Sequence, residues 1–207
     1  MKSPTLKKLM LVFGSAFVLQ AATVQAQSTA WSESYRLETA LKYADALKQM
    51  DSVLSTQPKN ELAVLRSGWL LYLLGKYPEA QRQYQKALDM NPVSITGLLG
   101  VMQQQMAQLL FVDARQTGLR ILKDSPWDYN AQVNIMYCDN KLSAWADLAK
   151  RAAAVSERYP TDATVLVYWA RAESALNNKK HARDLYARVL EIVPGHIEAT
   201  AYLKAPS

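Results

Sequence analysis

Five of the eight prolines in this chain stand at a constant spacing of 34 residues, at positions 58, 92, 126, 160 and 194. Other residue types keep the same spacing. The position twelve residues before each proline holds a small residue in four cases and a leucine in one: Ala46, Ala80, Ala114, Leu148 and Ala182. A period of this length over most of 207 residues predicts stacked copies of one supersecondary unit.

Each unit has the pattern of two helices. In residues 61–92, apolar side chains recur at helical rather than strand spacing, at Leu62, Leu65, Trp69 and Tyr72. The proline ends the second helix because it lacks the backbone N–H that the helix needs. One such unit cannot bury its apolar face alone, so neighbouring units must stack. We therefore expect an all-α fold.

The pattern resembles the tetratricopeptide repeat. In the clearest unit, Gly68 occupies the small position of the first helix, Gly75 and Tyr77 mark the turn, and Tyr84 is the aromatic residue of the second helix. The resemblance implies a right-handed superhelical solenoid of helix–turn–helix units with one capping helix. The expected boundaries are 27–58, 61–92, 95–126, 129–160 and 163–194 for the repeats, and 195–207 for the cap.

Three repeats depart from the family pattern. The first, third and fourth replace the small residue of the first helix with Ser34, Met102 and Met136. The same three repeats replace the aromatic residue of the second helix with Met50, Gly118 and Ala152. These are therefore the weaker matches to the family.

The first 26 residues have the pattern of a cleavable signal peptide. A basic start is followed by an apolar run and by small residues that end at Ala26, so Gln27 is the expected mature N-terminus. A retained membrane anchor is the alternative, but Gly14, Ser15 and Gln20 interrupt the apolar run. We expect an exported, periplasmic protein.

The net charge of +6 overstates the basicity of the mature chain. The segment 1–26 holds three lysines and no acidic residue, so 24 basic residues become 21 against 18 acidic ones, or +3. We therefore expect no nucleic-acid partner, because that would need an extended basic face. No phosphate-binding loop, nucleophile motif or metal-ligand spacing occurs in the sequence. We expect no cofactor, no metal and no enzymatic activity.

Cys138 is the only cysteine. A lone cysteine in an exported chain is most often a buried small hydrophobe. A reactive thiol is the alternative, although Tyr137 and Asp139 beside it offer nothing that would lower its pKa.

The resemblance also implies where a partner binds, because the first helices of this family line a concave groove. Amide side chains there can pair with the main chain of an extended peptide, and aromatic side chains supply contact area. The alternative for each residue is packing against a neighbouring repeat. The expected groove residues are Trp31, Tyr35, Trp69, Tyr72, Gln103, Met106, Asn130, Asn134, Tyr137, Asn140 and Arg171.

These features predict a non-enzymatic interaction scaffold of the cell envelope that assists assembly of an envelope or export complex. Two alternatives stay open. The chain is a structural subunit of an obligate oligomer that uses its convex face or its ends, or it is a cell-wall enzyme or enzyme activator.

Overall fold

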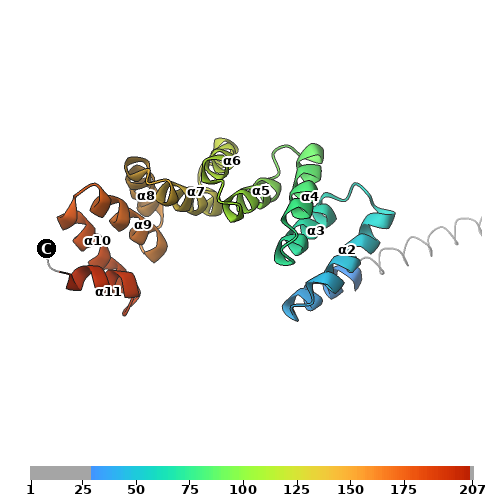
Figure 1. Ribbon diagram of the computed structural model, residues 1–207, viewed down its shortest axis with the longest axis horizontal. Coiled ribbons are helices and arrows are strands. Elements are labelled where there is room, and N and C mark those ends of the chain that lie inside the picture. The colour runs from blue at the N-terminus through green and yellow to red at the C-terminus, as the bar shows by residue number, and fades with distance from the viewer. Residues whose placement is uncertain (1–28, 206–207) are drawn as a thin grey trace, which may run out of the picture. The chain divides into compact units, whose positions relative to one another are not determined.

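The computed structural model describes residues 29–205, in which all regular secondary structure is α-helical, and the predicted all-α fold class is confirmed. The expected signal peptide lies outside the described residues. Residues 29–39 are helical, and the following helices alternate with short turns (Figure 1). They are α2 (Tyr43–Thr56), α3 (Glu61–Leu73), α4 (Tyr77–Met90), α5 (Ile95–Ala107), α6 (Phe111–Asp124), α7 (Tyr129–Lys141), α8 (Trp145–Arg158), α9 (Ala163–Ala175), α10 (Lys179–Ile192) and α11 (Ile197–Lys204).

The chain divides between Pro92 and Val93 into two compact units. In unit 1 the helix over 29–39 and α2 precede α3 and α4, and each of α2, α3 and α4 packs on its neighbour in sequence. In unit 2 the helices from α5 to α11 also pack consecutively, and the first helices α5, α7 and α9 contact one another in that order. Each expected repeat range from 61 onward holds two helices.

The first helix of each repeat from the second to the fifth, and α11, begins at one capping side chain. Asn60 accepts from the Ala63 N–H at 3.1 Å, and Asp128 accepts from the Ala131 N–H at 2.8 Å. These side chains satisfy backbone donors that have no partner within the helix. The capping residues recur every 34 positions: Asn60, Ser94, Asp128, Asp162 and His196.

The turn inside each repeat contains one residue with a positive φ angle. Gly75 adopts φ = 70° in the second repeat, which glycine does without steric cost. Leucine takes the same place in the first and third repeats, where Leu41 has φ = 59° and Leu109 has φ = 61°. A bulky residue is strained in this region, so the repeat geometry imposes the turn even where the residue does not favour it.

Packing inside a repeat depends on one small and one large residue facing each other. A Cβ added to Gly68 would lie 2.9 Å from Cε1 of Tyr84, so only glycine fits beneath that ring. In the third repeat the sizes are exchanged. A Cβ on Gly118 would lie 2.9 Å from Cε of Met102 and 2.6 Å from Cγ1 of Ile135. The two departures from the family pattern in this repeat therefore compensate each other.

Candidate partner-binding faces

In unit 1, the face formed by the helix over 29–39 and by α3 is held together by a polar network. Arg66, only 8% exposed, donates through Nη1 to Oε2 of Glu38 at 2.5 Å and through Nε to the Ser34 hydroxyl at 3.2 Å. The indole N–H of Trp69 donates to Oε1 of Glu38 at 2.6 Å. The polar edge of Trp69 is thus committed to a helix–helix contact.

The aromatic side chains of the unit 1 face also contact one another or the core. Tyr35 is 54% exposed, with its ring centroid 3.7 Å from the guanidinium carbon of Arg66. Trp69 stacks on Tyr72 at 5.7 Å between ring centroids, and Trp31 packs against the apolar core of the unit. This face offers apolar ring surface. The indole N–H of Trp69 and the Nε and Nη1 groups of Arg66 already donate to residues within unit 1.

In unit 2, the corresponding face lies on the first helices α5 and α7 and carries amide side chains without partners. Gln103 comes from α5, and Asn130, Asn134 and Asn140 come from α7. Within the described residues, none of these four amides makes a side-chain hydrogen bond. Asn130 and Asn134 are one helical turn apart and therefore lie on the same side of α7. We call these four residues, with Met106 and Tyr137, the unit 2 face.

The apolar members of the unit 2 face are anchored. Met106 and Tyr137 pack against a core cluster that contains Met102 and Ile135. The Tyr137 ring also meets Phe111 edge to face at 5.8 Å between centroids. Tyr137 stays partly exposed, so a rigid aromatic surface lies on the same helix as three of the four free amides.

Arg171, the last of the expected groove residues, connects α9 to α11. It donates through Nε and Nη2 to the two oxygens of Glu198 at 2.7 and 2.5 Å, and the Tyr186 hydroxyl donates to the same carboxylate at 2.7 Å. The hydrogen bonds from Arg171 lower the pKa of Glu198. The guanidinium of Arg171 is therefore committed to holding the last helix.

A buried ionic cluster links α6, α7 and α8, and the sequence analysis did not predict it. Asp139 is fully buried, with Oδ1 2.6 Å from Nε of Arg115 and Oδ2 3.6 Å from Nε of Arg151. Arg115 also bonds to Asp147 at 2.6 Å. Burial raises the pKa of Asp139, and the two guanidinium groups oppose that rise. The only sequence signal was that Arg115, Asp139 and Arg151 are charged at positions that are uncharged in most other repeats.

Cys138 is buried, as predicted. Burial, followed by the neighbouring charge of Asp139, raises the pKa of its thiol to about 12. Near pH 8 only about one thiol in ten thousand is then ionised, and the thiolate is the reactive form.

We expect iodoacetamide near pH 8 to leave Cys138 unmodified in the folded chain and to alkylate it fully in urea. In the folded chain the rate should rise about tenfold for each pH unit, because the ionised fraction does so below the pKa. Intact-mass spectrometry measures both rates. Equal rates with and without urea would show that the thiol is accessible and ionised.

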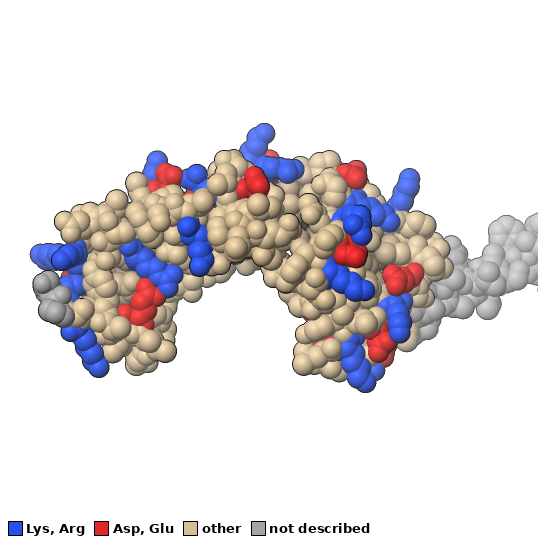
Figure 2. Space-filling model, in the orientation of Figure 1, with Lys and Arg blue, Asp and Glu red and all other residues tan. Residues whose placement is uncertain are grey.

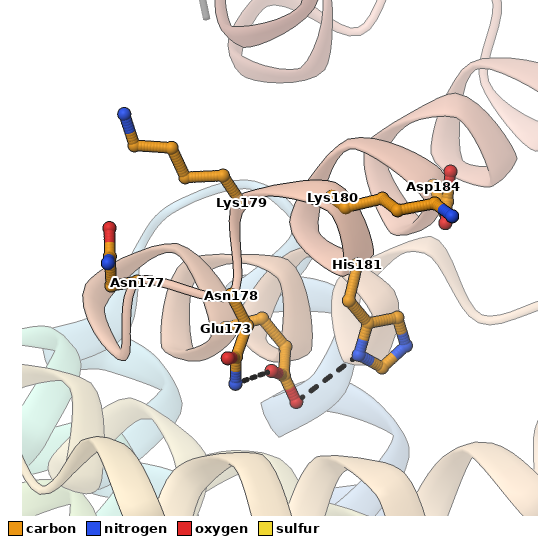
Figure 3. A pocket seen from close by; sticks show the side chains of 7 residues that line it. All are labelled: Glu173, Asn177, Asn178, Lys179, Lys180, His181 and Asp184. Carbon is orange, nitrogen blue, oxygen red and sulfur yellow. Dashed lines mark hydrogen bonds and ion pairs between the residues drawn. The ribbon is translucent and has the colours of Figure 1, made fainter.

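A cavity of about 670 Å³ opens at the turn between α9 and α10 (Figure 3). At its floor, Glu173 accepts from Nδ2 of Asn178 at 2.7 Å and from the indole of Trp169 at 2.8 Å. Nδ1 of His181 lies 3.5 Å from the same carboxylate. These contacts close the turn, and His181 remains half exposed at its rim.

Within 29–205, no group of three or more potential metal-binding side chains comes together. No helix in that range has both the length and the apolar character that crossing a bilayer requires. On the face drawn in Figure 2, basic and acidic side chains are interspersed rather than gathered into one basic surface.

Comparison with solved structures decides the fold. A tetratricopeptide repeat protein from Parabacteroides merdae has a TM-score of 0.76 at 15% identity, covering 86% of this chain and 71% of that one. YrrB, described as a TPR protein with an unusual peptide-binding site, has a TM-score of 0.70 at 18% identity, covering 85% and 91%. PilW, a type IV pilus biogenesis factor, has a TM-score of 0.70 at 18% identity, covering 82% and 78%. The chain has the tetratricopeptide-repeat fold.

No family model and no curated protein matches this chain. The likeness is therefore one of fold, at identities too low to transfer a partner or a residue role. In the TPR fold of this chain, Trp31, Tyr35, Trp69 and Tyr72 belong to unit 1. Gln103, Met106, Asn130, Asn134, Tyr137 and Asn140 belong to unit 2, and Arg171 is occupied by Glu198.

Proposed function

We propose that this chain is a non-enzymatic scaffold for protein–protein interaction, and that its unit 2 face binds an extended segment of a partner protein. The observation that carries the proposal is the set of amides without partners at Gln103, Asn130, Asn134 and Asn140, on helices that also present Tyr137.

The chemistry of these side chains fits an extended peptide. Each amide offers both a donor and an acceptor, so it can pair with main-chain groups without reading the partner's sequence. Tyr137 and Met106 are already packed in place, so little conformational entropy is lost when a partner covers them. On the unit 1 face, by contrast, Trp69 and Arg66 are bonded to Glu38.

We further propose that the scaffold works in the cell envelope, where it assists assembly of a complex. The pattern of residues 1–26 supports export. The fold is shared with PilW, a pilus biogenesis factor, and with YrrB, a TPR protein with a peptide-binding site. Both likenesses support the proposal at the level of fold.

The test uses peptides selected from a random displayed library against the full chain. Asn134→Ala and Tyr137→Ala should each weaken binding of the selected peptides by about tenfold or more, because one removes main-chain hydrogen bonds and the other a buried aromatic contact. Gln116→Ala is the matched control, since Gln116 is an exposed amide on the second helix α6.

Calorimetry measures each affinity, and circular dichroism checks that each variant is folded. If folded Asn134→Ala and Tyr137→Ala bind as tightly as the unaltered chain, the unit 2 face is not the binding surface. N-terminal sequencing of the chain recovered from cells tests export, for which Gln27 is the expected first residue.

A further inference from the structure

A cavity of about 280 Å³ lies on the other side of the fourth repeat, away from the unit 2 face, between the loop before α7 and the second helix α8. Trp127 forms one wall, Ala154 lies on α8, and the polar lining comes from Gln132, Asp147, Lys150 and Arg151. The function proposed above uses none of these residues.

Arg151 is held rigidly at this cavity. Its Nε lies 3.6 Å from the buried carboxylate of Asp139, and its Nη1 donates to Oε1 of Gln132 at 3.0 Å. Gln132 is fixed in turn, because its Nε2 donates to the carbonyl of Pro126 at 2.8 Å. The Nη2 group of Arg151 has no hydrogen-bond partner within the described residues and keeps some contact with solvent.

Gln132 differs from the residues that stand at its position in other repeats. At the position of Gln132, the second, third and fifth repeats carry Val64, Leu98 and Leu166, all buried and apolar. Gln132 is itself buried. An apolar residue at this position would pack without the hydrogen-bond partners that a buried polar side chain needs. The glutamine instead orients the guanidinium of Arg151.

The groups that remain free around the cavity are mostly cations and donors. Asp147 is paired with Arg115 at 2.6 Å. Lys150 has no ion pair among the described residues, and neither does Arg158, whose guanidinium carbon lies 5.3 Å from the Trp127 ring. The indole N–H of Trp127 also has no partner there, and 46% of this residue is exposed. An oriented guanidinium, a free ammonium and an aromatic wall favour an anion attached to an apolar group.

We propose that this cavity binds a carboxylate carried next to an apolar side chain on a peptide. The carboxylate pairs with Nη2 of Arg151 and Nζ of Lys150, and the apolar side chain lies against Trp127 and Ala154. The C-terminus of a peptide supplies such a carboxylate, and so does an internal acidic side chain. The site is separate from the unit 2 face and does not depend on the function proposed for it.

The experiment titrates the full chain with three short peptides at low salt and follows backbone amide shifts by NMR. The peptides are acetyl-Ala-Ala-Leu with a free carboxylate, the same peptide with a terminal amide, and acetyl-Ala-Glu-Leu with a terminal amide. The free acid should shift amides around Trp127 and Lys150 and bind about tenfold or more tightly than its amide, as expected for a charge-assisted contact. Binding of the glutamate peptide at the same place identifies an internal acidic residue as the source.

Lys150→Met and Trp127→Ala test the contacts without touching the buried cluster, because both residues are exposed. Each should weaken binding of the free acid about fivefold or more, whereas Lys179→Met, the matched control on α10, should leave it unchanged. Three results overturn the proposal: equal binding of acid and amide, unchanged binding by both variants, or no shift around the cavity at millimolar peptide.

Discussion

Replacing Asp139 with alanine is expected to lower the free energy of unfolding by about 3 kcal/mol. The carboxylate is fully buried between Arg115 and Arg151, and its removal leaves two guanidinium groups without their shared counter-charge. The expected value is at the low end of the range for buried ion pairs, because both arginine side chains keep some contact with water.

Urea denaturation followed by circular dichroism measures this change. Asp147→Ala is the control: its carboxylate also bonds to Arg115 but is mostly exposed, so it should cost less than about 1 kcal/mol. Converting the cluster to apolar residues, with Asp139→Leu, Arg115→Met and Arg151→Met together, should recover most of the lost stability. An Asp139→Ala variant as stable as Asp147→Ala would contradict this account of the cluster.

Replacing Gly118 with tyrosine, the residue that the family pattern expects there, should destabilise the chain by about 3 kcal/mol. The ring has no space, because even a Cβ at this position would meet Ile135 at 2.6 Å and Met102 at 2.9 Å. Gly118→Ala should cost about 1 kcal/mol, since the same overlap is partly offset by the higher helix propensity of alanine.

Met102→Gly should partly rescue Gly118→Tyr, because the pair then matches Gly68 and Tyr84 of the second repeat. A double-mutant cycle in urea should show a favourable coupling of about 1 kcal/mol or more. Recovery stays partial because Ile135 still lies against the ring position. Additive effects of the two substitutions would show that the exchanged sizes do not compensate each other.

Much of the fold was predictable from spacing alone. The prolines, the small residues and the helical apolar pattern indicate paired helices in repeats of 34 residues. One equally regular signal was missed. Residues able to cap a helix stand at 60, 94, 128 and 162, where each begins a first helix, and at 196, which begins α11. A search of the same register for capping residues would have found these helix starts.

The candidate site was only partly predictable. Helical spacing puts Asn130, Asn134 and Tyr137 on one side of their helix, and all three lie in α7. The same spacing cannot tell which polar groups already have partners. Trp69 and Arg171 look equivalent to Tyr137 in the register, yet Glu38 and Glu198 occupy their hydrogen-bonding groups.

Local sequence patterns predict the repeat length, the helix pairs and the export-like N-terminus. They do so because helix propensity, capping and apolar periodicity act over a few residues along the chain. The role of each polar side chain depended on contacts between residues far apart in the sequence, such as Arg66 with Glu38, 28 positions apart, or Arg115 with Asp139, 24 positions apart. Repeat packing brings those residues together, and burial then sets how strongly their charges interact. For that reason, which amides are free and where Arg151 is held became visible only once the helices were packed.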